Sequence, residues 1–333
     1  MKMRLPRLPL VAALMVISCL GMAPPAGHAA RPSYNLMMNW FPEPEEGGFY
    51  EAQRLNLYQK AGLTSSVELF GFIVTTEQYV LSGRAAFGMG SADELLQYNA
   101  RGAHLVAVMA TFQKNPIGIL WHAEDKTVRG PADLSHHTLI YSFGVPYEKY
   151  LVARYHYTDF STKNNDFSSR AFAADPLAVH QCYVTSEPYL YTKQGLKVKY
   201  AFIADTGYNP YGNVIYTTQQ FAAAHPEVVR AFVTASVKGW HAYLQHPEAT
   251  NTFMRSAPGA RNYPETPEEQ RFSFSQMSRF HLVDGGDAAR HGLGSFTLDR
   301  WRTLQRQMDG SGFSVGKVNP AESFTNRFLP GSR

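Results

Sequence analysis

At residues 39–50 the chain reads Asn-Trp-Phe-Pro-Glu-Pro-Glu-Glu-Gly-Gly-Phe-Tyr, and this segment joins a predicted strand to a predicted helix. Residues 34–40 form an apolar run of strand length, and residues 49–62 carry apolar side chains at helical spacing. The segment therefore lies at the carboxyl end of a first strand, which is the usual ligand edge of an open α/β sheet. We expect its two glycines to let the backbone come close to whatever lies beside it.

The same segment gathers aromatic rings and carboxylates. Its candidate ligand-binding residues are Asn39, Trp40, Glu43, Glu45 and Glu46. An indole stacks on flat rings or covers a cation, and carboxylates accept hydrogen bonds from amino groups, so the pattern favours a flat or cationic ligand. The structural alternative is a rigid proline turn with aromatic residues capping the core and solvated glutamates.

Strands and helices alternate after this segment. We expect strands at 66–71, 86–90 and 104–109, and helices at 75–83 and 91–102. This alternation predicts a parallel sheet with right-handed crossovers. The second of these helices begins with two further candidate binding residues, Ser91 and Asp93, where Ser91 is placed to cap it.

A second α/β unit follows, and the chain crosses to it and back. A strand at 118–122 leads away, and a strand at 211–217 returns. Between them we expect a strand at 138–141, a helix at 147–155, a helix end at 177–181 and strands at 182–186 and 198–203. The predicted fold class is α/β with two doubly wound lobes and a two-crossing hinge. The first lobe comprises 31–118 and 212–333, and the second comprises 119–211.

The remainder of the chain is predicted to be helical. The expected helices span about 226–244, 265–280 and 298–308, and Trp240 and Trp301 are interpreted as core residues. We expect residues 319–333 to form a loosely held tail.

Two more polar clusters lie in or beside the second unit. Ser186, Glu187 and Tyr189 follow a buried strand and begin a helix, where they either bind a ligand or cap the helix. Tyr208 and Tyr211 lie at the return crossing, where they either close on a flat ligand or pack in a hinge.

The amino terminus resembles an export signal. Residues 1–29 contain three basic residues, then an apolar run and a small-residue end, so we expect cleavage after Ala29 or Ala30 and a periplasmic protein. Alternatively, the residues ending at Cys19 resemble a lipoprotein box, which would give a lipid anchor there. Removal of 1–29 would lower the formal net charge from +4 to +1, which gives no support for a nucleic-acid partner.

Enzyme signatures are missing from the sequence. The 12 histidines are scattered, and neither a Gly-x-Ser-x-Gly elbow nor a Gly-x-Gly-x-x-Gly turn is present. The chain has two cysteines, and a cut after residue 29 leaves only Cys182, so neither a disulfide nor a zinc site is expected. We predict no catalytic residues, no metal and no cofactor.

Four motifs, at residues 39–50, 88–94, 183–189 and 207–211, together resemble the periplasmic substrate-binding proteins of ABC importers. The branch is similar to thiamine-pyrimidine binding proteins and, more distantly, to nitrate and sulfonate binders. The resemblance runs from about Tyr34 to Leu244. It implies a periplasmic binding protein type II fold and a monomer that hands a small solute to a membrane permease. In that family, the roles of stacking and of contacting amino groups would fall on Trp40 and Glu187.

The resemblance leaves three alternatives open. The first is an enzyme similar to the fungal pyrimidine synthase, whose signature carries a histidine where this chain has Glu46. The second is a periplasmic sensor that reports its ligand to a membrane receptor. The third is an anion binder of the nitrate or sulfonate type, although glutamates would meet an anion with the wrong charge.

Overall fold

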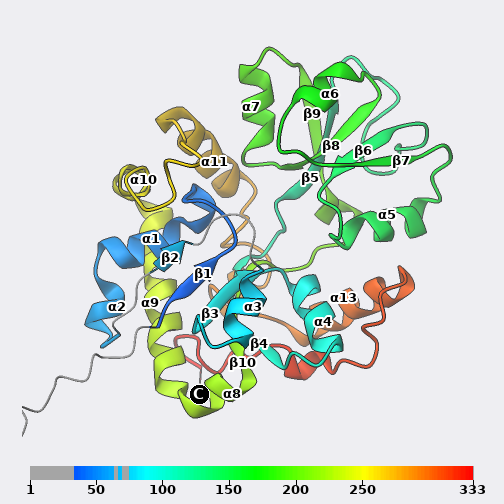
Figure 1. Ribbon diagram of the computed structural model, residues 1–333. Coiled ribbons are helices and arrows are strands. Elements are labelled where there is room, and N and C mark those ends of the chain that lie inside the picture. The colour runs from blue at the N-terminus through cyan, green and yellow to red at the C-terminus, as the bar shows by residue number, and fades with distance from the viewer. Residues whose placement is uncertain (1–33, 64–66, 70–74, 333) are drawn as a thin grey trace, which may run out of the picture. The chain divides into compact units, whose positions relative to one another are not determined.

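Two mixed sheets, each of five strands, dominate the part of the chain that the structure describes. The structure is a computed structural model that describes residues 34–63, 67–69 and 75–332 (Figure 1). The predicted signal peptide and Cys19 lie outside the described residues. Within the described ranges, no helix is both long and apolar enough to cross a membrane.

The first sheet has the strand order β2-β1-β3-β10-β4. Strand β1 (Leu36–Met38) pairs in parallel with β2 (Val67–Leu69) and β3 (Phe87–Gly90). Strand β10 (Gly212–Thr218) lies between β3 and β4 (Leu105–Phe112) and is antiparallel to both. The strands of the predicted alternation, β1 to β4, all run in the same direction, as expected, and the antiparallel strand among them is the returning strand β10, whose direction was not predicted.

The second sheet repeats this pattern in the order β7-β6-β8-β5-β9. Strand β6 (Thr138–Tyr141) is parallel to β7 (Ser161–Asn164) and β8 (Ala178–Tyr183), whereas β5 (Ile117–His122) is antiparallel to β8 and to β9 (Val198–Phe202). Of residues 177–181, predicted as a helix end, residues 178–181 belong instead to β8, where hydrogen bonds to strands on both sides favour the extended backbone.

Helices cover the sheets and fill the carboxyl-terminal third (Figure 1). The longest, α9 (Pro226–Gln245), buries one face that includes Trp240, as predicted for that tryptophan. The helices other than α9 are α1 (Gly47–Arg54), α2 (Leu57–Lys60), α3 (Thr76–Leu81), α4 (Ala92–Ala100), α5 (Tyr147–Tyr155), α6 (Arg170–Ala174), α7 (Glu187–Lys193), α8 (Gln219–Ala224), α10 (Glu248–Met254), α11 (Pro267–Arg279), α12 (Ala288–His291) and α13 (Leu298–Gly310). Three short 3₁₀ turns are η1 (Pro44–Glu46), η2 (Ile203–Thr206) and η3 (Pro320–Glu322).

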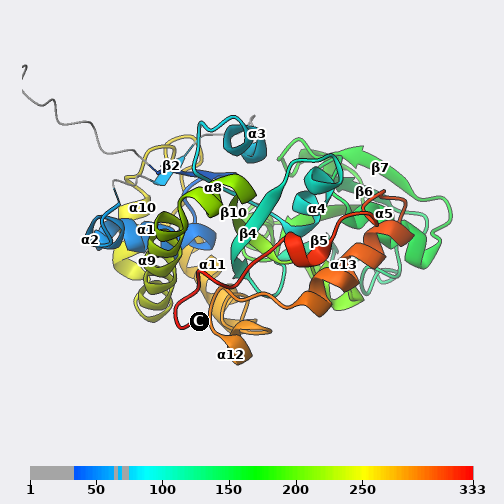
Figure 2. The same cartoon turned by 90° about the horizontal axis from the view of Figure 1, so that it is seen from below.

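The two segments that join the sheets are bonded to each other and to α13. Asn115 donates its backbone N–H to the Asn209 side chain over 2.9 Å and its own amide to Pro210 O over 3.2 Å. Arg300 of α13 donates to the carbonyl oxygens of Gln113 and Asn209, one on each segment, at 2.6 and 2.9 Å. Helix α13 also lies against both α4 and α5 (Figure 2). One arginine thus ties together both segments that connect the sheets.

Two further predictions of local structure were wrong. The single helix expected at 49–62 is broken at Asn56, whose φ of 56° is left-handed and ends α1 before α2 begins. The carboxyl-terminal residues expected to be loose are packed instead, because Phe328 is fully buried and the backbone of Ala107 exchanges hydrogen bonds with Ser323 and Thr325. A terminal segment with its own apolar side chains and a bridge to β4 is ordered by tertiary contacts.

Candidate functional site

The site begins where β1 ends, at the segment from Asn39 to Glu46. Proline at position 44 begins the 3₁₀ turn η1, since its fixed φ suits the first position of a helical turn. The Trp40 indole N–H donates to the Glu43 carboxylate over 3.0 Å, which orients the ring. The turn then buries all three glutamates, and Glu43, Glu45 and Glu46 are only 4%, 3% and 2% exposed. The alternative of solvated glutamates is therefore wrong.

Each buried glutamate of the turn has some internal hydrogen bonding, yet two oxygens lack a partner. Ser273 of α11 donates to Glu45 Oε1 over 3.0 Å, and Asn213 of β10 donates to Glu46 Oε1 over 3.2 Å. The other carboxylate oxygens, Glu45 Oε2 and Glu46 Oε2, are buried without any hydrogen-bond partner. An unsatisfied buried acceptor is costly, so these two atoms are prepared to accept hydrogen bonds from a ligand.

These groups line a cavity of about 1080 Å³ including its mouth, which we call the acidic cavity. Three aromatic residues, Trp40, Phe167 and Tyr263, stand together at one side, with ring centroids of Trp40 and Phe167 5.8 Å apart and of Trp40 and Tyr263 6.0 Å apart. Among its described lining residues there is no Lys, Arg or His. The lining is formed by Asn39, Trp40, Glu43, Glu45, Glu46, Glu94, Ser142, Asn165, Phe167, Gln181, Tyr183, Ser186, Glu187, Asn213 and Tyr263.

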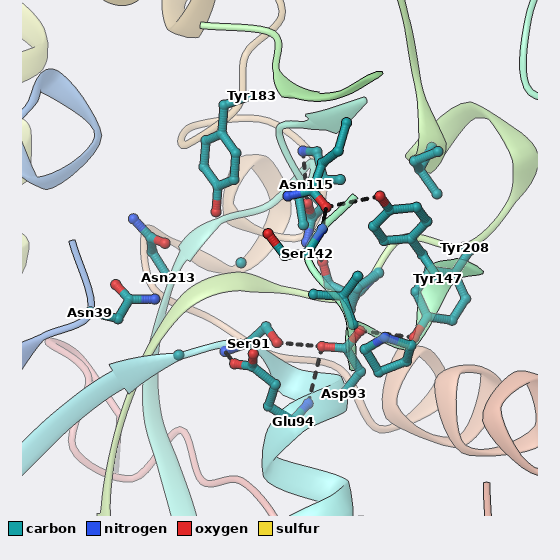
Figure 3. Close-up of a pocket in the computed structure, with 18 residues that line it drawn as sticks. Asn39, Ser91, Asp93, Glu94, Asn115, Ser142, Tyr147, Tyr183, Tyr208 and Asn213 are labelled. Carbon is teal, nitrogen blue, oxygen red and sulfur yellow. Dashed lines mark hydrogen bonds between the residues drawn. The ribbon is translucent and has the colours of Figure 1, made fainter. Parts of the chain in front are cut away.

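A second cavity of about 770 Å³ adjoins the first, and we call it the hydroxyl–amide cavity (Figure 3). It shares six lining residues with the acidic cavity, namely Asn39, Glu94, Ser142, Gln181, Tyr183 and Asn213. The residues that line it alone are Gly90, Ser91, Asp93, Asn115, Ile117, Val145, Pro146, Tyr147, Ile203, Tyr208, Pro210 and Gly212. The two cavities are therefore adjoining parts of one cleft between residues of both sheets.

The predicted polar residues Ser91, Asp93 and Tyr208 meet in the wall of the hydroxyl–amide cavity. Asp93 accepts hydrogen bonds from the Ser91 hydroxyl, from the Tyr208 hydroxyl at 2.8 Å and from the Glu94 backbone at 3.1 Å. The Glu94 carboxylate in turn accepts from the Ser91 backbone N–H at 3.0 Å. Both oxygens of the Asp93 carboxylate are thus hydrogen-bonded within the protein, unlike those of Glu45 and Glu46.

Burial shifts the carboxyl groups of the cleft toward their protonated form. Desolvation, followed by the charges of neighbouring glutamates, raises the pKa of Glu43 and Glu46 well above the usual value. Burial raises the pKa of Glu187 and of Glu94 to about 7, and that of Glu265, just outside the acidic cavity, to about 9. The cleft therefore carries less negative charge near pH 7 than its number of glutamates indicates.

These raised values predict how the stability of the empty protein depends on pH. A carboxyl whose pKa is higher in the folded than in the unfolded state binds more protons when the protein is folded. Its contribution to the free energy of unfolding is therefore complete below about pH 4.5 and is lost as the pH rises through the folded-state pKa. The stabilising contribution of Glu187 and Glu94 is lost as the pH passes about 7, and that of Glu265 is lost as the pH passes about 9. We expect a melting temperature that falls from pH 5 to pH 9.

Carboxyls with lowered pKa values, such as Glu51 beside Arg54, stabilise the fold fully only above the usual carboxyl pKa. Their contribution is lost as the pH falls below it, so they limit the stability of the protein in acid. A Glu265→Gln variant removes one raised group, so it should flatten the fall between pH 7 and 9. A melting temperature that rises steadily over this range would contradict the expected burial of these carboxyls.

Not every predicted residue lies in the cleft. Ser186 and Glu187 line the acidic cavity, where Glu187 accepts from the Tyr183 backbone N–H at 2.8 Å. Tyr189 lies in a different cavity and packs on Phe272, with ring centroids 5.2 Å apart. Tyr211 is buried, lines neither part of the cleft, and donates its hydroxyl to Asp287 at 2.5 Å.

The glycines of the 39–50 segment allow a close approach, as expected, and the neighbour that makes it is a helix. A Cβ added to Gly48 would lie 2.1 Å from Trp240, and one added to Gly47 would lie 2.2 Å from Tyr243. The close approach predicted at these glycines is therefore made by helix α9, not by a ligand.

Several lining residues were missed by sequence reasoning. Gln181 and Tyr183 lie two positions apart on β8 and hence on one face, and Ser142 directly follows β6, so the strand pattern and the strand-end rule could have found them. Phe167 and Tyr263 lie in loops, where no periodic signal marks them. Among the described residues, no group of three or more His, Cys, Asp or Glu is arranged to hold a metal ion.

Solved structures of other proteins share this arrangement of sheets. The alkanesulfonate-binding protein SsuA from Xanthomonas axonopodis pv. citri superposes with a TM-score of 0.65 at 14% identity, covering 89% of this chain and 99% of its own. A ligand-binding component of an ABC-type import system from Staphylococcus aureus superposes with a TM-score of 0.67 at 11% identity, covering 91% and 99%. The fold is that of the periplasmic binding proteins, as predicted.

The sequence also defines a family. Residues 43–250 match the family described as NMT1/THI5 like, and the chain belongs to that family. This assignment confirms the resemblance inferred from the four motifs. The riboflavin-binding protein RibY of Chloroflexus aurantiacus is 25% identical over 358 aligned positions, covering 99% of each chain.

Proposed function

We propose that this chain is the solute-binding component of an ABC importer and captures a small, flat, hydrogen-bond-donating heterocycle in the acidic cavity. The observation that carries the proposal is the pair of buried, unpartnered acceptors, Glu45 Oε2 and Glu46 Oε2, beside the aromatic wall of Trp40, Phe167 and Tyr263. The rings would stack on the heterocycle, and the carboxyl groups would accept from its N–H or amino groups. Thiamine-pyrimidine precursors, cationic amines and flavins all present such groups.

The proposal includes export and closure. The two sheets would belong to lobes formed by 31–118 with 212–333 and by 119–211, which would close on the ligand about the two crossing segments. The predicted signal peptide supports a periplasmic location, and a membrane permease would receive the solute. Two similar proteins support this role, since one is named for riboflavin binding and another is described as part of an ABC-type import system.

The charge of the cleft disfavours an anionic ligand. Neither cavity has a Lys, Arg or His among its described lining residues, and a sulfonate or nitrate needs positive groups or many directed N–H donors. A synthase-type enzyme is also disfavoured, because the position of its reactive histidine is held by Glu46, which is 2% exposed and hydrogen-bonded to Asn213.

Ligand binding should raise the melting temperature of the purified protein, residues 31–333. A ligand at 100 times its dissociation constant adds about 2.7 kcal/mol to the free energy of unfolding. The panel should contain aminopyrimidines, thiamine precursors, riboflavin, quaternary amines, alkanesulfonates and nitrate. We expect shifts with one of the flat or amino-bearing compounds. Shifts confined to sulfonates or nitrate would contradict the proposal.

A Glu46→Gln variant tests the carboxyl acceptors directly. The amide has nearly the same shape but cannot ionise and carries an N–H₂ donor, so a ligand whose N–H groups bind the ionised carboxylate should bind more weakly by about 1.5–3 kcal/mol. Calorimetric titration of the best ligand measures the loss. The matched control is Glu268→Gln at an exposed position of α11, where Glu268 pairs with Arg271 and its replacement should leave affinity unchanged. If both variants bind the ligand as tightly as the parent does, Glu46 does not contact the ligand.

A further inference from the structure

The cleft has two parts whose lining residues differ in chemistry, and a single flat ring would use only one of them. The acidic cavity carries the aromatic wall and the unpartnered carboxylate oxygens, and the adjoining hydroxyl–amide cavity adds about 770 Å³ including its mouth. A pyrimidine bound in the acidic cavity would not occupy the hydroxyl–amide cavity.

The hydroxyl–amide cavity is built from groups that both donate and accept. Figure 3 shows the hydroxyls of Tyr183 and Ser142 and the amides of Asn39 and Asn213 around its central space. The structure records no hydrogen bond from the Tyr183 hydroxyl, the Ser142 hydroxyl or the Asn39 amide to any described residue. Gln181 uses its Oε1 to accept from Tyr147 and from the Ser142 backbone at 2.9 and 3.1 Å, which leaves its N–H₂ group for another partner.

The hydroxyl–amide cavity offers few favourable contacts to a charged group of a ligand. No described Lys, Arg or His lines it, so a phosphate or carboxylate would have no counter-charge. Its two acids, Asp93 and Glu94, are committed to Ser91, Tyr208 and backbone N–H groups, so an ammonium would have to displace existing bonds. Hydroxyl groups fit best, because each both donates and accepts, as the surrounding amides and hydroxyls do.

We infer that the ligand has two parts, a planar heterocycle in the acidic cavity and a neutral polyhydroxylated side chain in the hydroxyl–amide cavity. This inference rests on the proposed function and narrows its ligand class. The side chain would hydrogen-bond to Ser142, Gln181, Tyr183 and Asn39, which line both cavities where they adjoin, and it would extend beside Val145 and the Asp93 wall, which line the hydroxyl–amide cavity alone. A ring without that chain would bind through the acidic cavity alone.

The test compares three probes by calorimetric titration and by quenching of tryptophan fluorescence. Riboflavin carries a ring with an alditol chain, lumichrome carries a related ring without the chain, and ribitol is the chain alone. We expect riboflavin to bind at least about tenfold more tightly than lumichrome, since several hydrogen bonds are added, and ribitol to bind weakly. Equal affinities of riboflavin and lumichrome would overturn the inference and leave the proposed function intact. Failure of both rings and of every other flat compound would contradict the proposed function itself.

A second comparison locates the side chain in the cleft. Val145 lines the hydroxyl–amide cavity and not the acidic cavity, so Val145→Phe should fill only the former. We expect this variant to weaken riboflavin by about tenfold or more while lumichrome binding stays within about threefold. The matched control, Val145→Ala, leaves the space open and should bind riboflavin nearly as the parent does. A loss shared equally by both rings, or by neither, would contradict the assignment of the two cavities.

Discussion

A Gly239→Ala variant is expected to be the most destabilised single-methyl variant that we predict, with a loss of about 2–4 kcal/mol in the free energy of unfolding. The added Cβ would lie 2.2 Å from Gly48 O and 2.7 and 2.8 Å from the Cβ and N of Ala52, so it would meet the backbone of α1 directly. A flexible side chain could rotate away, but a helix backbone has to shift as a unit.

Urea unfolding monitored by circular dichroism measures this loss. The control is Gly310→Ala at the end of α13, where an added Cβ meets no atom within 4 Å. That variant should keep or slightly raise stability, because alanine restricts the unfolded chain more than glycine does. A Gly239→Ala protein within about 0.5 kcal/mol of the parent would mean that α1 and α9 can separate at little cost.

The contact between α1 and α9 also matters for the site. Helix α1 follows η1 without a break, and η1 carries Glu45 and Glu46. A shift of α1 away from α9 would therefore move the two unpartnered carboxylate oxygens. We expect Gly239→Ala to weaken ligand binding even though residue 239 lines neither cavity.

Local patterns in the sequence predicted most of the elements that build the site. The 39–50 segment was placed correctly between a strand and a helix, because an apolar run of strand length meets a helical periodicity there. The crossings near residues 118 and 211 were also found, because β5 and β10 are short apolar runs at the right places. These features depend on neighbours in the chain, which a single sequence displays.

Features set by distant contacts were not predictable in this way. The glycines at 47 and 48 were expected to allow a close approach, but the sequence did not show that the neighbours would be Trp240 and Tyr243, almost 200 residues later. Phe167 and Tyr263 complete the aromatic wall from loops, and only the fold brings them to Trp40. The raised pKa values of the cleft glutamates were likewise not predictable, since they depend on a degree of burial that composition does not reveal.

A Trp40→Ala variant is expected to lose about 1–3 kcal/mol of binding free energy, which corresponds to about 5- to 150-fold in affinity. The indole is held by its hydrogen bond to Glu43 and by the rings of Phe167 and Tyr263, so it is already oriented before a ligand arrives. Its removal takes away a stacking surface and also leaves Glu43 Oε1 without its indole donor. Titration calorimetry with the best ligand of the panel measures the effect.

Two comparison variants separate stacking from general damage. Trp40→Phe keeps an aromatic face but lacks the N–H, so its affinity should fall between those of the parent and the alanine variant. Tyr189→Ala removes another aromatic residue near the cleft, but Tyr189 faces a different cavity, packed on Phe272, and its loss should leave affinity unchanged. If Tyr189→Ala weakens binding as much as Trp40→Ala does, the ligand lies beside α7 and not on the aromatic wall. The pair of variants therefore decides which of two neighbouring aromatic cavities receives the solute.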